Sequence, residues 1–132
     1  MKRKEKGAPR EGREQSQRQL KMGEQIRHTL SEATLREDLL DPLGQPITLT
    51  FTEVRCSPDL RLAKAYYVPL GEVPEADCEQ ALKTALPHLQ AAVAKKSTSK
   101  FTPKLTFRYD RSFDQADHLR AVLADLPEGD RR

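Results

Sequence analysis

The chain has 132 residues, of which 33% are charged and 36% are hydrophobic, and its formal net charge is +3. This length fits one domain with short tails, and two cysteines are too few for a framework of disulfide bonds. No apolar run approaches membrane-spanning length, and Met1 is followed by charged residues instead of the apolar stretch of a secretory signal, so we expect a cytoplasmic protein.

Charge is unevenly distributed along the chain. Residues 1–21 hold eight Lys and Arg side chains against three Glu, whereas the other 111 residues hold 15 cations and 17 anions. Residues 1–14 contain almost no large apolar side chain, which predicts a disordered basic arm. Such an arm can attract phosphate groups, or it can serve only as a solubilising tail. Farther along, residues 72–79 are acidic and residues 95–111 are basic, so charge is also segregated within the predicted domain.

The predicted domain, residues 15–126, begins with a helix over residues 15–37. Its apolar side chains recur at helical spacing and define one buried face: Met22, Ile26, Leu30 and Ala33. Turn-forming Asp, Gly and Pro residues follow at positions 41–46 and end this helical segment.

Two strands are predicted next, over residues 47–56 and 60–70. The alternation of apolar and polar residues slips near Thr52, which predicts a β-bulge at that point. A tight turn at residues 57–59 brings the second strand back antiparallel to the first. The second strand is expected to bury Ala63, Ala65 and Tyr67 and to expose Lys64 and Tyr66.

The next helix, residues 75–96, contains Pro87 in the middle of its apolar pattern. Because proline lacks an N–H and its ring clashes with the preceding turn, we expect the helix to bend or restart there. A third strand over residues 104–109, a last helix over residues 114–126 and a flexible tail over residues 127–132 complete the chain. In the third strand, inward and outward side chains alternate, with Leu105, Phe107 and Tyr109 inward and Lys104, Thr106 and Arg108 outward.

The predicted order is helix, strand, strand, bent helix, strand, helix. A three-stranded sheet with helices on one face makes a two-layer α+β domain.

Three segments in this order resemble the ribosome-binding factor A family of bacteria. They read GEQIRHTL at residues 23–30, ITLTFTEVRCSPDLRLAKAYY at residues 47–67 and FTPKLTFRYDRS at residues 101–112. The resemblance extends over residues 17–126 and implies a type II KH-like fold. In that family a kink between two helices replaces the Gly-x-x-Gly loop with which KH domains clamp RNA. No glycine lies between Gly71 and Gly129, which agrees with that replacement.

Two departures from the family pattern lie near the kink. Ala85, Leu86 and Pro87 stand where family members usually have Ala-x-Gly, and Gln90 stands where many have Arg. Proline at the first position of a restarted helix is compatible with the same bend.

The resemblance also implies a function and partners. The chain would be a ribosome assembly factor that binds the immature small ribosomal subunit and its ribosomal RNA during late maturation and rRNA processing. It would act as a monomer without chemistry of its own, and an assembly GTPase would promote its release.

Ten polar or charged residues are candidates for contact with RNA. The strongest are the five cations around the third strand, since few acids balance them, although they could also form an ordinary solvated surface. Arg27 could instead pair with Glu24 or Asp38. The candidates are Arg18, Lys21, Arg27, His88, Gln90, Lys95, Lys96, Lys100, Lys104 and Arg108. We expect recognition of phosphate and shape, because the sequence shows no aromatic platform for stacking bases.

Catalytic patterns are missing from the sequence, so we expect no enzymatic activity, no cofactor and no metal. The three histidines lack metal-ligand spacing. Structural roles are expected for two acids: Asp59 can bond backbone amides after its turn, and Asp110 can cap the end of a strand.

The alternative function is a non-enzymatic protein-interaction module that docks through the acidic segment 72–79 or through an exposed strand edge.

Overall fold

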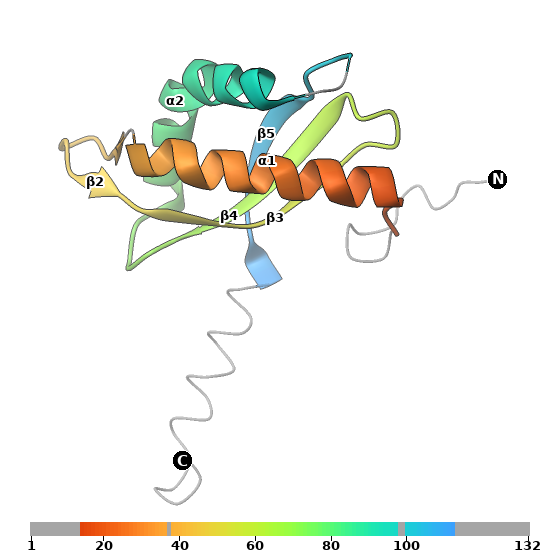
Figure 1. Cartoon of the computed structure of the whole chain (residues 1–132). Coiled ribbons are helices and arrows are strands. Elements are labelled where there is room, and N and C mark those ends of the chain that lie inside the picture. Colours follow the sequence, from red (N-terminus) through yellow and green to blue (C-terminus); the bar gives the residue numbers. More distant parts are fainter. Residues whose placement is uncertain (1–13, 37, 98–99, 113–132) are drawn as a thin grey trace, which may run out of the picture.

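The computed structural model describes residues 14–36, 38–97 and 100–112. Two helices cover one face of a three-stranded sheet, and a small two-strand hairpin lies beside them (Figure 1). This is the α+β arrangement expected from the sequence. Residues 1–13 of the predicted arm, the last predicted helix and the tail lie outside the described residues. The elements are α1 (Gln17–Arg36), β1 (Leu39–Leu40), β2 (Pro46–Ile47), β3 (Leu49–Cys56), β4 (Leu62–Pro69), α2 (Glu75–Lys96) and β5 (Lys104–Tyr109).

A capping box determines where α1 begins. The Ser16 amide donates to Gln19 Oε1 at 2.8 Å, and the Gln19 amide donates to Ser16 Oγ at 3.1 Å. These reciprocal bonds satisfy amides that have no partner within the helix. Gln19 Nε2 also donates to the Cys56 carbonyl at 2.8 Å, so the same side chain fixes the start of α1 to the end of β3. Met22, Ile26 and Leu30 form the buried face as predicted.

Gly23 allows α1 to approach β3 closely. It lies in the buried face of the helix, and a Cβ added there would overlap with the carbonyl oxygen of Val54. Glycine costs a helix roughly 1 kcal/mol relative to alanine, so its presence in the interior of α1 is explained by this contact.

The hairpin β1–β2 was not predicted from the sequence. Two-residue strands are too short to show alternation, and only the turn at residues 41–46 could be anticipated. Asp41 closes that turn, because its Oδ1 accepts hydrogen bonds from the amides of Leu43 at 2.9 Å and Gln45 at 2.8 Å. Gly44 adopts a φ of 83°, a conformation that glycine reaches without steric cost.

The main sheet has the order β3-β4-β5, with β3 and β4 antiparallel and β4 and β5 parallel. The bulge predicted near Thr52 is confirmed, since the register shifts between Phe51 and Glu53. The expected exposure of Tyr66 is wrong, because only 8% of its surface is exposed. Tyr66 lies on the central strand directly opposite Glu53 on β3 and Arg108 on β5, so residues with long side chains flank it on both neighbouring strands.

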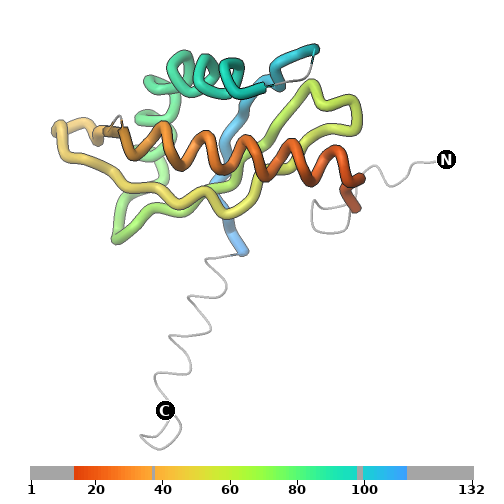
Figure 2. The backbone as a smooth tube through the Cα atoms, viewed as in Figure 1, coloured from red at the N-terminus to blue at the C-terminus, as the bar shows by residue number. Residues whose placement is uncertain are grey.

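The α2 helix continues through Pro87 and changes direction near its middle, as Figures 1 and 2 show. Its buried side chains, Cys78, Ala81, Leu82, Leu89 and Val93, come from both halves. The bend therefore lets one helix follow the curved core on either side of the proline. Gln90 ties the second half to the sheet: its Nε2 donates to the Pro103 carbonyl at 2.7 Å, and its Oε1 accepts from the Leu105 amide at 3.1 Å.

The core joins the inner faces of all three main strands to both helices. Leu105 is buried, and Phe107 and Tyr109 pack against the core as predicted. Cys56 and Cys78 are free thiols inside it, and burial raises the pKa of each to about 11. Both cysteines therefore act as small apolar side chains.

Candidate nucleic-acid interface

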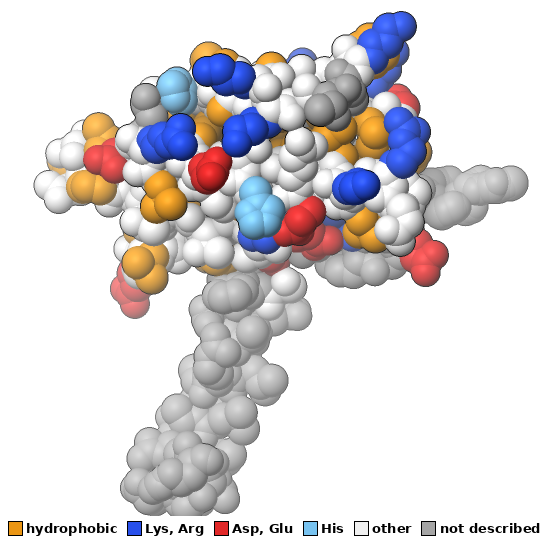
Figure 3. Space-filling view, in the orientation of Figure 1, with side chains coloured by type: hydrophobic (Ala, Val, Ile, Leu, Met, Phe, Trp, Pro, Cys, Tyr) orange, Lys and Arg blue, Asp and Glu red, His pale blue; other side chains and the backbone are white. Residues whose placement is uncertain are grey.

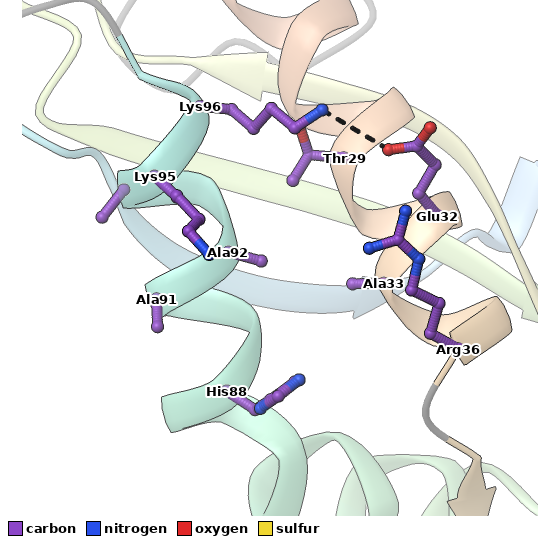
Figure 4. A pocket seen from close by; sticks show the side chains of 10 residues that line it. Thr29, Glu32, Ala33, Arg36, His88, Ala91, Ala92, Lys95 and Lys96 are labelled. Carbon is purple, nitrogen blue, oxygen red and sulfur yellow. Dashed lines mark ion pairs between the residues drawn. The ribbon is translucent and has the colours of Figure 1, made fainter.

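A groove of about 600 Å³ separates α1 from the second half of α2. Small side chains such as Ala33, Ala91 and Ala92 leave room along it, and polar side chains from both helices face the same space (Figure 4). Gln25 spans the two helices, because its Nε2 donates to the Lys96 carbonyl at 2.9 Å. This bond joins α1 to the last turn of α2.

Cations from both helices line the groove. Lys95 and Lys96 lie on α2 and Arg36 faces them from α1, while His88 lies farther along α2 (Figure 4). One acid, Glu32, lines the groove, and Lys96 Nζ lies 3.6 Å from its Oε1. Both partners of this ion pair are more than half exposed, so it contributes little to stability and leaves the lysine able to exchange partners. Figure 3 shows Lys and Arg side chains along this part of the surface.

A second basic surface lies on the opposite side of the sheet. Arg108 lines a hollow of about 520 Å³ together with Arg55 and Lys64, and Tyr66 lies among them. Arg55 Nη1 is 2.8 Å from Glu53 Oε2, and Glu14 also lines the hollow, so acids offset part of this charge.

Lys100 and Lys104 lie at the end of the sheet where the α2–β5 loop meets the β3–β4 turn. The Lys104 amide donates to the Arg61 carbonyl at 2.8 Å, which joins the two connections. Phe101 belongs to the same loop and is 46% exposed, although the sequence predicted no aromatic platform.

The three candidates on α1 have different environments. Arg18 and Lys21 are exposed near its first turn. Arg27 pairs with Glu24, as anticipated, and this hydrogen bond lowers the pKa of the Glu24 carboxyl and raises the pKa of the Arg27 guanidinium.

The predicted candidates therefore do not form one surface. The structure brings Lys95, Lys96 and His88 together at the groove and places Arg108 on the other side of the sheet. The Gln90 side-chain amide is hydrogen-bonded to the backbone of Pro103 and Leu105, and its contact with RNA stays a prediction. Sequence reasoning missed Arg36, Arg55 and Arg61, because their positions depend on which elements become neighbours.

The two acids that could suggest catalysis have the structural roles expected for them. Asp59 Oδ1 accepts hydrogen bonds from Ser57 Oγ at 2.7 Å and from the Arg61 amide at 3.1 Å. Asp110 Oδ1 accepts from the Ser112 amide at 3.0 Å. Among the described residues, no three His, Cys, Asp or Glu side chains gather in a way that could hold a metal ion, and no helix is long and apolar enough to cross a membrane.

Comparison with known proteins decides the family. The family model described as ribosome-binding factor A matches residues 18–123. This chain belongs to the ribosome-binding factor A family. A ribosome-binding factor A from a Ruegeria species is 46% identical over 82% of this chain and 82% of its own length.

Solved structures of ribosome-binding factor A share the fold. The crystal structure of the protein from Thermus thermophilus is similar with a TM-score of 0.60 at 24% identity, covering 71% of this chain and 97% of that one. A homology model of the Thermus thermophilus factor, fitted into a cryo-electron-microscopy map of a 30S–RbfA complex, has a TM-score of 0.52 at 28% identity. It covers 67% of this chain and 91% of that one. The KH-like fold inferred from the sequence is confirmed by these relationships.

Proposed function

We propose that this chain is a ribosome assembly factor that binds the small ribosomal subunit through its ribosomal RNA. Its membership in the ribosome-binding factor A family supports this function, as does its similarity to a protein fitted into a map of a 30S complex. The single observation that carries the proposal is the groove between α1 and α2, which Arg36, Lys95 and Lys96 line together. Clustered cations beside a bent helix suit a phosphate backbone, and this binding requires no chemical step.

Co-sedimentation with isolated small subunits tests the proposal. Lys95→Glu reverses a charge that lines the groove, and we expect it to weaken binding while the unfolding temperature stays unchanged. Lys83→Glu is the matched control, because Lys83 is an exposed lysine of the first half of α2 that does not line the groove. Equal binding by both variants would contradict the assignment of the site, and no binding of the wild-type protein would contradict the function.

The dependence of binding on salt separates the two functions considered. A complex held by phosphate contacts should weaken steeply as salt increases, because bound counterions are released from RNA. A complex whose affinity does not change with salt concentration would favour the alternative function, a protein-interaction module that docks through residues 72–79. One acid of that segment is already engaged, since Arg111 Nη2 lies 2.9 Å from Glu75 Oε1.

Late maturation and rRNA processing, a monomeric state in the cytoplasm and release by an assembly GTPase belong to the same proposal. They rest on the family relationship. Sedimentation with precursor and mature small subunits, with and without the GTPase and GTP, tests the release step.

A further inference from the structure

An exposed aromatic ring lies between cations at one end of the sheet. Phe101 is 46% exposed, the Arg61 guanidinium carbon lies 4.1 Å from the centre of its ring, and Lys100 Nζ lies 5.8 Å from it. The arrangement joins the α2–β5 loop to the β3–β4 turn, and Lys and Arg side chains gather over these two connections at the upper right of Figure 3. An aromatic face beside a planar guanidinium is what a nucleotide base stacks on.

Described residues of both connections tie this group to the fold. On one side, Pro103 is fully buried and its carbonyl accepts the hydrogen bond from Gln90, two residues after Phe101. On the other side, Leu60 is 7% exposed and adopts a φ of 61°, and its amide donates to the Ser57 carbonyl at 2.8 Å. A platform held in place before binding loses less conformational freedom when a ligand arrives.

The local charge favours a polyanion. Arg61, Lys100 and Lys104 bring three cations to this end of the sheet. Asp59 is the acid of the adjoining turn, and its carboxylate is occupied by the Ser57 hydroxyl and the Arg61 amide. A ring alone would suit any apolar ligand, whereas a ring among cations suits a base that is attached to phosphate.

We propose that Phe101, with Arg61 and Lys100, is a stacking site for an unpaired base of single-stranded RNA. The inference rests on the proposed function, since it specifies which part of the RNA, an unpaired base, the chain would bind at this site. It adds recognition of single-stranded segments to the contacts with phosphate at the α1–α2 groove.

The test uses a tryptophan as reporter, because the chain has none of its own. The probe is a single-stranded oligoadenylate RNA carrying a fluorescent label, and its anisotropy reports binding. Emission from Phe101→Trp should fall when the oligonucleotide binds, since a stacked base quenches indole fluorescence. A duplex RNA of the same length should leave this emission unchanged.

Affinity provides the second measurement. Phe101→Leu keeps an apolar side chain without an aromatic face, and it should bind the oligonucleotide about fivefold or more weakly than the wild type. Phe101→Tyr should bind like the wild type. Both variants should unfold at the wild-type temperature, because the side chain is half exposed.

Three results would overturn the stacking site. Phe101→Leu could bind the oligonucleotide as tightly as the wild type, the emission of Phe101→Trp could stay unchanged when the oligonucleotide binds, or the wild-type protein could fail to bind it at concentrations up to about 100 µM.

Sedimentation with small subunits separates failure of the stacking site from failure of the proposed function. If Lys95→Glu weakens subunit binding and Phe101→Leu does not, the function stands and the stacking site falls. If the wild-type protein does not sediment with subunits, the function itself falls.

Discussion

The side chain of Tyr67 shows how a single polar atom is tolerated inside this core. Its hydroxyl is buried without a hydrogen-bond partner among the described residues, while its ring packs edge-to-face on Tyr109 with centroids 5.8 Å apart. Burial raises the pKa of the Tyr67 hydroxyl, and Cys78 and the acids Glu75 and Glu79 raise it further. The aromatic ring is therefore the stabilising part of this residue, and the hydroxyl opposes folding.

Replacing Tyr67 by phenylalanine should stabilise the protein. An unsatisfied buried hydroxyl costs about 1–3 kcal/mol, so we expect Tyr67→Phe to raise the free energy of unfolding by about 1 kcal/mol. Urea unfolding followed by circular dichroism measures this change. Tyr109→Phe is the control, since Tyr109 is only partly buried. A lower stability of Tyr67→Phe would show that the hydroxyl has a partner such as an ordered water.

At the scale of elements, the approach of α1 to β3 determines how tightly the helix layer packs. Gly23 brings the helix backbone against Val54, and Gln15 and Gln19 both donate to the Cys56 carbonyl at 2.8 Å. These contacts fix α1 at its start and in its first half. They also fix the position of Arg36 relative to the second half of α2, and thus the shape of the groove.

A methyl group at Gly23 should disturb this packing. Gly23→Ala favours the helix by up to about 1 kcal/mol, but overpacking against a backbone carbonyl costs about 1–3 kcal/mol or more. We therefore expect a lower free energy of unfolding, measured by chemical denaturation. Ser31→Ala, on the same helix, controls for the gain in helix propensity. An increase in stability for Gly23→Ala would mean that the helix can move away from β3 at little cost.

At the scale of the whole molecule, cations are divided between two sides of the sheet. The α1–α2 groove and the hollow around Arg108 cannot both meet one flat surface, so a single RNA contact would use one of them or wrap around an edge. The basic residues 1–14 precede α1 and add further positive charge to the chain.

Deleting residues 1–14 tests the contribution of this segment. The capping bonds between Ser16 and Gln19 and the bond from Gln15 to Cys56 remain, so the unfolding temperature should not change. Affinity for small subunits should fall modestly, and the slope of affinity against salt should become shallower because fewer cations contact phosphate. A large loss of thermal stability would show instead that the segment packs on the domain.

The sequence predicts the elements better than the surfaces that they build. Periodicity identifies the strand at residues 104–109 with its observed bounds, and the phase slip at Thr52 locates the bulge. The same local patterns cannot show that Tyr66 lies on a central strand with long side chains opposite it on both neighbouring strands. They also cannot show that Arg36 and Lys95 line the same groove, because this depends on how α1 and α2 pack on the sheet.

The parallel pairing of β4 with β5 has a consequence for synthesis of the chain. During translation, the antiparallel β3–β4 pair can form as soon as residue 69 has emerged, whereas β5 follows only after the whole of α2. Until then the growing polypeptide presents β4 as an open edge, which invites pairing with another chain. We therefore expect a fragment that stops before Lys104 to self-associate more than the full chain does, which sedimentation of the two measures.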